Sequence, residues 1–292
     1  MRSGFFSRIV FTASAGTATA VASQTAVANE PVPLPRDYAD VCGTDNPYLA
    51  GVCYDAQDWF GSGYDWAAIV AFRDTGNDAP ADPPILHWLA SASDVGSVWG
   101  LGFRRGDSTL YASAFHKRLV RFGPGGPGAL YKVDPFTGVA ALFATVPNAG
   151  AVHHSASADL RDPDDEARDW AGKTSLGDLD VDDEQDELFV VNLNDRRIHR
   201  FDLADGRPLG SFEHGAAHDP RSSDMRPFAL KFHDGKLYHG VVDSAERGGG
   251  AANLAGRVYE SDRDGTNMRL VASFPLTYGR GFARVQGVIT AP

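Results

Sequence analysis

Val98-Trp99-Gly100-Leu101-Gly102-Phe103 is followed by a turn at 105–107 and then by Leu110-Tyr111-Ala112-Ser113-Ala114-Phe115. Two short β-rich runs joined by a tight Gly/Asp turn predict an antiparallel hairpin. The chain continues with a third run at Ala129–Asp134, a turn at 135–138, and a fourth run at Ala140–Phe143. This stretch therefore predicts one unit of four antiparallel strands.

The same order of four runs recurs twice further along the chain. The second unit comprises Leu176–Val181, Leu188–Leu193, Ile198–Asp202 and Leu209–Phe212, and the third comprises Pro227–Phe232, Leu237–Val242, Arg257–Ser261 and Leu270–Phe274. Recurrent four-stranded units are typical of the blades of a β-propeller. Insertions at 147–172 and 243–255 explain why the spacing between the units is irregular.

Parts of further blades flank these units. Ala67–Phe72 and Ile85–Leu89 resemble the last two strands of an earlier blade, and Arg280–Ala283 repeats the pattern of Arg226–Ala229. We predict an all-β fold, a β-propeller of about three full four-stranded blades plus partial blades, in which either the N-terminal strands complete the last blade or the ring is incomplete. A sandwich of hairpins is the competing all-β fold, but it does not predict one recurring strand order.

An open ring leaves strand backbone unpaired, around Ala67–Phe72 and after Phe282. Exposed strand edges pair readily with other chains. The sequence therefore predicts either self-association through these open blade edges or a continuation of the propeller in a longer protein.

The composition excludes several classes of partner. The 292 residues carry a net charge of −11, and 43% of them are hydrophobic. An acidic chain without clustered Lys and Arg argues against nucleic-acid binding. No apolar run of about 18 residues follows the N-terminus, so we expect no internal membrane span.

The N-terminus has the pattern of a secretory signal peptide over residues 1–28. Arg2 and Arg8 precede an apolar stretch, and Ala26-Val27-Ala28 forms a cleavage site ahead of Asn29. A disordered leader is the alternative. We therefore expect a secreted, extracellular or cell-surface protein with a short N-terminal segment at 29–66 and a propeller region at 67–292.

Cys42 and Cys53 are the two cysteines of the chain. In a secreted protein an even pair predicts a disulfide, which would pin the 29–66 segment.

The densest acidic segment is Asp178–Glu184, which suggests calcium because hard cations bind carboxylate oxygens. As an EF-hand loop it fails, since Asp183 and Phe189 stand where Gly and Glu are needed. Asp182–Glu187 is better explained as a solvated hairpin turn. Asp178 differs because it lies within the first strand of its unit, so it is the metal candidate.

Aligning the units places equivalent residues in columns. One column holds Gly100, Asp178, Ala229 and Ala283, and another holds Ser97, Ser175, Arg226 and Arg280. First strands of propeller blades line the central channel. We therefore predict that Ser175, Asp178, Arg226 and Arg280 form a binding site there, with Asp178 close to Arg226 or Arg280. A structural Asp–Arg network is the alternative.

Basic residues follow two of the second strands, at His116-Lys117-Arg118 and Asp195-Arg196-Arg197. Lys117 and Arg118 are candidates for a rim that binds acidic groups such as glycan uronates. An ordinary charged loop is the alternative. We interpret His153, His154, His214 and His218 as solvent-exposed rather than metal-binding.

Several segments resemble a recurrent region of large secreted bacterial surface proteins, which often carry SdrD B-like modules after it. The segments are Gly96–Leu101, Leu110–Arg118, Phe122–Gly128, Gly172–Asp180, Val191–Arg197 and Arg226–Leu230, and together they span about residues 95–285. The resemblance implies an extracellular, propeller-like domain with an adhesive or structural role. It transfers no catalytic residues, and no B-type module is visible in this chain.

Two functional hypotheses remain. The first is a secreted, non-enzymatic propeller that binds an extracellular protein or glycan, adheres, or builds a surface layer. It is favoured because nucleophile signatures such as G-x-S-x-G are absent from the sequence. The alternative is a channel-centred, metal-dependent hydrolase or lactonase that uses Asp178. A channel plugged by Trp99, Phe228 and Phe282 would favour the first hypothesis.

Overall fold

The computed structural model describes residue 34 and residues 47–55, 65–73, 86–155 and 164–278, together with two short strands near the C-terminus. The predicted signal peptide lies outside the described residues. So do Cys42, Arg280 and Phe282. Cys53 is described and half-buried, and its pairing with Cys42 stays a prediction.

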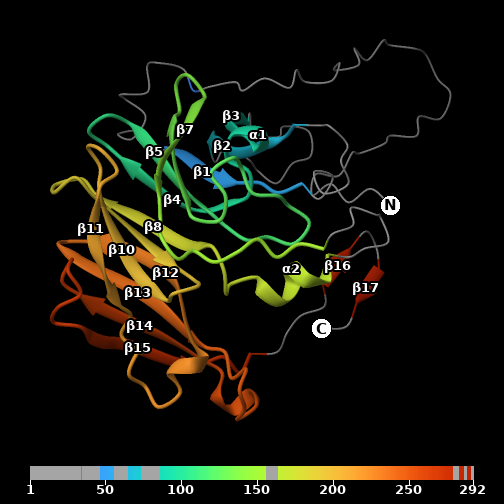
Figure 1. Cartoon of the computed structure of the whole chain (residues 1–292), viewed down its shortest axis with the longest axis vertical. Coiled ribbons are helices and arrows are strands. Elements are labelled where there is room, and N and C mark those ends of the chain that lie inside the picture. Colours follow the sequence, from blue (N-terminus) through green and yellow to red (C-terminus); the bar gives the residue numbers. More distant parts are fainter. Residues whose placement is uncertain are drawn as a thin grey trace.

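The described chain is built almost entirely from antiparallel sheets (Figure 1). The first sheet contains β1 (Tyr48–Val52), β2 (Ala67–Arg73) and β3 (His87–Ser91). The second contains β4 (Val98–Arg104), β5 (Thr109–Ala114), β6 (Ala129–Asp134) and β7 (Val139–Thr145). The third contains β8 (Leu176–Asp182), β9 (Glu187–Asn192), β10 (Arg197–Asp202) and β11 (Pro208–Glu213). The fourth contains β12 (Met225–His233), β13 (Lys236–Asp243), β14 (Ala255–Ser261) and β15 (Arg269–Pro275).

The remaining elements are short. They are a hairpin of β16 (Ala283–Val285) and β17 (Val288–Thr290), helices α1 (Ala92–Val95) and α2 (Asp165–Trp170), and 3-10 turns at Ser222–Asp224 and Ala251–Asn253. None of the helices in the described ranges is long and apolar enough to cross a membrane.

The three predicted four-stranded units are confirmed, each as one sheet in simple sequence order. The predicted strands Ala67–Phe72 and Ile85–Leu89 correspond to β2 and β3, which follow a further strand, β1, from the 29–66 segment. One expectation was wrong. Ala67–Phe72 is not an open edge, because β2 pairs with β1 on one side and with β3 on the other.

The first strands of successive four-stranded sheets lie next to one another. β8 contacts both β4 and β12, so the sheets follow each other around their first strands (Figure 1). Each first strand has a register shift at the same place, between Val98 and Leu101, between Leu176 and Leu179, and between Pro227 and Leu230. A bulge kinks a strand and changes where its side chains point. Its recurrence confirms that Gly100, Asp178 and Ala229 occupy equivalent positions.

Glycine allows β4 and β8 to approach closely. A Cβ atom on Gly100 would lie 2.6 Å from the backbone nitrogen of Leu179, which is closer than any side chain tolerates. At this contact Ser113 accepts a hydrogen bond from the Gly100 N–H (3.0 Å) and donates one to the Gly177 carbonyl (2.7 Å). One hydroxyl group thus satisfies a backbone N–H of β4 and a backbone carbonyl of β8 where the two sheets meet.

The core consists of apolar layers between neighbouring sheets. Tyr111 and Leu130 of the second sheet pack with Leu179 and Leu188 of the third. Phe189 and Ile198 of the third sheet pack in the same way with residues of the fourth, which include Leu230 and Leu237. Burial of apolar surface between sheets is the main source of stability in such a fold.

Candidate functional site

Asp178 joins two sheets. Its Oδ2 accepts a hydrogen bond from the backbone N–H of Leu230 (3.1 Å) on β12, and its Oδ1 accepts one from the N–H of Leu179 (3.0 Å). Burial raises the pKa of the Asp178 carboxyl group. The two hydrogen bonds lower this pKa, but the effect of burial is larger. Among the described residues, no hydrogen bond or ion pair joins Asp178 to Arg226, whose guanidinium pairs with Glu246. Arg280 lies outside the described residues, so the contact of Asp178 with Arg226 or Arg280 stays a prediction.

Asp180 repeats the arrangement two residues further along β8. Its Oδ2 accepts the backbone N–H of Phe232 (2.8 Å) and forms an ion pair with Lys231 Nζ (2.7 Å). Alternate residues of a strand point to the same side, so Asp178 and Asp180 both face β12. These carboxylates take the place of the carbonyl groups that a neighbouring strand would offer.

Ser175 is fully buried and holds the start of β8 in place. Its Oγ lies 2.9 Å from the Ala114 carbonyl and 2.7 Å from the Pro127 carbonyl, and its backbone N–H donates to Ala149 (2.6 Å). Its φ of 67° belongs to the left-handed region. A buried hydroxyl engaged in this way is not exposed to a ligand.

The two predicted rim residues both have protein partners. Lys117 Nζ lies over the ring of Tyr54, 5.1 Å from its centroid, and Arg118 lies 3.9 Å from the Asp165 carboxylate. In the described part of the chain, no hydrogen bond or ion pair links Lys117 or Arg118 to Arg226. The role of Lys117 and Arg118 as a rim stays a prediction.

Three aromatic rings meet where the first strands begin. Trp99 on β4 lies 5.4 Å from both Phe115 and Phe228, measured between ring centroids, and Phe115 and Phe228 are 5.8 Å apart. The cluster contains two of the three residues expected to plug a central channel. Trp99 nevertheless keeps 42% of its surface exposed, so one ring remains open to solvent.

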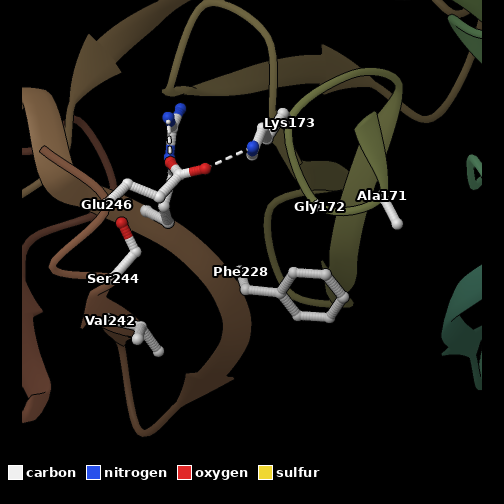
Figure 2. A pocket seen from close by; sticks show the side chains of 8 residues that line it. Ala171, Gly172, Lys173, Phe228, Val242, Ser244 and Glu246 are labelled. Carbon is white, nitrogen blue, oxygen red and sulfur yellow. Dashed lines mark hydrogen bonds and ion pairs between the residues drawn. The ribbon is translucent and has the colours of Figure 1, made fainter. Parts of the chain in front are cut away.

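A pocket of about 320 Å³ has one of these rings, Phe228, in its wall (Figure 2). It is lined by Ala171–Lys173 ahead of β8, by Arg226 and Phe228 of β12, and by Val242, Ser244 and Glu246 at the end of β13 and in the following loop. Its volume lies at the small end of the range of roughly 300–1,000 Å³ typical of ligand pockets. Figure 2 shows the Phe228 ring pointing toward Ala171 and Gly172.

Glu246 is at the centre of the charges in this pocket. Its carboxylate accepts a hydrogen bond from Arg226 Nη2 (2.9 Å) and forms an ion pair with Lys173 Nζ (Figure 2). The hydrogen bond from Lys173, together with that from Arg226, holds the pKa of Glu246 below its usual value. The Nε of Arg226 is buried and donates to no acceptor within the described part of the chain.

More positive charge lies nearby. Arg196 Nη1 donates to the carbonyl groups of Ser222 (2.9 Å) and Ser223 (3.3 Å). Burial and the proximity of Arg226 and Arg247 lower the pKa of Arg196. In a chain with a net charge of −11, this is a local concentration of cations. Such a concentration attracts anions.

Four of the described histidines are buried, namely His116, His199, His214 and His239, and for His214 this contradicts the expectation that it is solvent-exposed. Burial lowers the pKa values of His116, His214 and His239 to about 4. His154 Nδ1 contacts the buried carboxylate of Asp164 at 2.8 Å. His218, by contrast, is exposed as predicted. Among the described residues, no group of three or more His, Cys, Asp and Glu side chains is arranged to hold a metal ion.

Sequence reasoning identified Arg226, Phe228 and Trp99, but it missed Lys173 and Glu246. Glu246 lies in the 243–255 insertion, and Lys173 directly follows the 147–172 insertion. Insertions into a regular repeat form surface loops, where binding residues concentrate. The two insertions were therefore the sequence feature that could have pointed to Lys173 and Glu246, although nothing in the sequence indicated that the two loops meet.

No family model matches the chain. Among curated proteins it is similar to Colossin-D of Dictyostelium discoideum, with 28% identity over 210 residues, covering 69% of this chain and 22% of Colossin-D. It is also similar to Colossin-A of the same organism, with 27% identity over 199 residues, covering 64% of this chain and 2% of Colossin-A. The chain thus spans about a fifth of Colossin-D and far less of Colossin-A.

Solved structures show weaker likeness. A protein from Lactobacillus plantarum has 12% identity and a TM-score of 0.42, with coverage of 80% of this chain and 69% of that one. A nidogen/laminin complex has 15% identity and a TM-score of 0.40, with coverage of 71% and 59%. Scores at this level support no conclusion about function.

Proposed function

We propose that this protein is a secreted, propeller-type binding domain without enzymatic activity, with an adhesive or surface-structural role. One observation carries the proposal. The pocket at Lys173, Arg226 and Glu246 opens to solvent and has in its wall Phe228, whose ring contacts the exposed Trp99. The strand residues Asp178 and Ser175, by contrast, are engaged in holding the sheets together. An open concave site with few charged groups is typical of ligand binding.

Secretion is part of the proposal and is supported by the N-terminal pattern that ends at Ala26-Val27-Ala28. We expect the mature chain to begin at Asn29 and to contain a Cys42–Cys53 disulfide. Intact mass under non-reducing conditions tests both, since two free thiols on folded protein would exclude the disulfide.

The binding role is tested by screening the secreted form against extracellular glycans and proteins. Wild type is compared with Arg226→Gln, which removes a pocket cation, and with Arg269→Gln, which removes an exposed cation on β15. We expect Arg226→Gln to lose the binding and Arg269→Gln to keep it. Binding that is insensitive to Arg226→Gln would place the ligand elsewhere.

The alternative is a hydrolase or lactonase that uses Asp178. The raised pKa of its buried carboxyl group is the observation that favours it, because such shifts occur in catalytic acids and bases. In this chain, however, both oxygens of Asp178 accept backbone hydrogen bonds. Lactone hydrolysis by wild type that disappears in Asp178→Asn would replace the binding proposal.

A further inference from the structure

We propose that Glu246 is a built-in occupant of an anion site, and that the ligand carries a carboxylate on a sugar ring, as in a uronate-containing glycan, and displaces it. The inference rests on the proposed binding function and names its ligand class.

The pocket has more positive groups than one carboxylate can satisfy. Lys173 and Arg226 both pair with Glu246, and Arg226 Nε remains without an acceptor within the described residues. Arg196 and Arg247 add further positive charge nearby. A planar guanidinium matches a carboxylate through two parallel hydrogen bonds, but among the described residues Arg226 donates only one such bond, through Nη2 to Glu246. A second carboxylate can therefore bind where Glu246 binds now.

Displacement requires only a rotation of the Glu246 side chain. The backbone on either side is fixed by Asp224, whose carbonyl accepts the Ser244 N–H (2.9 Å) and whose Oδ1 accepts the Arg247 N–H (3.1 Å). The Glu246 side chain itself is about one-third exposed (35%). Side chains with such access to solvent change rotamer quickly, within nanoseconds.

The aromatic residues indicate what accompanies the carboxylate. Phe228 forms one wall of the pocket, and its ring contacts Trp99, which is exposed. Rigid aromatic faces provide apolar contact area at a low cost in conformational entropy. A sugar ring offers a flat face of C–H groups to such a wall, whereas a flexible acidic side chain does not. The geometry therefore favours a uronate over an acidic peptide.

A resident carboxylate lowers the apparent affinity for the ligand, because only molecules with the two cations free can bind it. Replacing Glu246 by Gln removes the competing charge while keeping the shape of the side chain. We expect Glu246→Gln to bind trigalacturonate about three- to tenfold more tightly than wild type. The control is Glu213→Gln, which changes the net charge equally at an exposed residue of β11.

Binding is measured by calorimetry or NMR titration with three probes, namely trigalacturonate, the neutral galactose trisaccharide and the acidic peptide Gly-Glu-Gly. The expected result is tighter binding of trigalacturonate to Glu246→Gln only, no change for the neutral sugar, and loss of binding in Arg226→Gln.

If Glu246→Gln binds no more tightly than Glu213→Gln while Arg226→Gln still abolishes binding, the displacement idea is wrong and the binding function stands. If the peptide binds as tightly as trigalacturonate, the sugar assignment is wrong. If trigalacturonate binds neither wild type nor Glu246→Gln, the inference is wrong, and the wider screen with Arg226→Gln then decides the proposed function separately.

Discussion

The carboxylate of Asp178 acts as a hydrogen-bond acceptor in the place of a backbone carbonyl. It accepts the N–H of Leu230 across a boundary where two sheets meet but no strand pairing continues. A buried donor left without an acceptor costs about 1–3 kcal/mol. Asp178, the candidate catalytic residue of the sequence, is thus explained by the backbone N–H of Leu230, which needs a hydrogen-bond acceptor.

We expect Asp178→Ala to lower the free energy of unfolding by about 1–3 kcal/mol, because the Leu230 N–H loses its acceptor. Asp178→Asn should cost less, since the amide oxygen can still accept and no charge is buried. Chemical denaturation measures both, with Asp169→Ala on an exposed part of α2 as the control. Equal losses in the Ala and Asn variants would contradict this account.

The buried histidines predict that the protein loses stability in mild acid. The pKa values of His116, His214 and His239 are about 4 in the folded chain, against 6.5 for an ordinary histidine. Between pH 6.5 and 4 the unfolded chain binds protons that the folded chain does not, so stability falls as the pH falls. Each histidine contributes up to about 1.4 kcal/mol per pH unit.

Thermal unfolding followed from pH 7 to pH 4 tests this prediction. His239→Gln should reduce the dependence on pH, and His218→Gln, at an exposed position, should leave it unchanged. A melting temperature that stays constant over this range would show that these imidazoles are not held neutral by burial.

Among the elements, β4 and β8 depend on glycine at their contact. A Cβ on Gly100 would meet backbone atoms of both Leu179 (2.6 Å) and Asp178 (2.9 Å), whereas a Cβ on Gly106 would meet nothing within 4 Å. Overpacking of this kind typically costs 1–3 kcal/mol, or roughly 2–4 °C in Tm for each kcal/mol in a domain of this size.

We therefore expect Gly100→Ala to lower Tm by about 4 °C or more, and Gly106→Ala to leave it within about 2 °C of wild type. Differential scanning calorimetry measures the difference. Equal Tm values for the two variants would mean that the sheets separate easily at this point.

The strands and their order were predictable from the sequence because their signals are local. Alternating β-branched and aromatic residues between Asp/Gly turns, as in Leu237–Val242 and the turn at 234–235, carry that information within a few residues. Equivalence between units was also predictable, and the recurring bulge confirms the column of Gly100, Asp178 and Ala229.

Contacts between loops were not predictable in this way. Lys173 and Glu246 are 73 positions apart, one directly after the 147–172 insertion and the other inside the 243–255 insertion, and the packing of β8 against β12 brings them together. The role of Asp178 was missed for a related reason. An inner-strand carboxylate looks the same in sequence whether it faces a ligand or a neighbouring backbone.

At the scale of the whole molecule, the face of the fourth sheet at Ala229 bears on association with another chain. In the second sheet the equivalent position, Gly100, is covered by β8. In the fourth sheet Ala229 is exposed and lies over Gly240. Two small residues at this place leave room for another strand or sheet to approach closely.

We expect the purified chain to self-associate through this face, and Ala229→Glu to prevent the association by adding charge to it. Val139→Glu, on the exposed outer strand β7, is the matched control. Light scattering over a range of concentrations gives the molar mass. A wild-type protein that stays monomeric at high concentration would contradict the prediction.

The two carboxylates of β8 have a consequence for how such proteins can be recombined. Asp178 and Asp180 are spaced by two residues, as are the backbone groups of Leu230 and Phe232 that they meet. The pair fixes the register of β8 against β12, because a shift of one residue would leave both backbone N–H groups without their carboxylate acceptors. Gene rearrangements that exchange sheets between relatives would have to keep β8 and β12 together as a single heritable cassette. At the contact between β4 and β8, an incoming sheet would have to supply a glycine at the position of Gly100 and a donor for the Gly177 carbonyl.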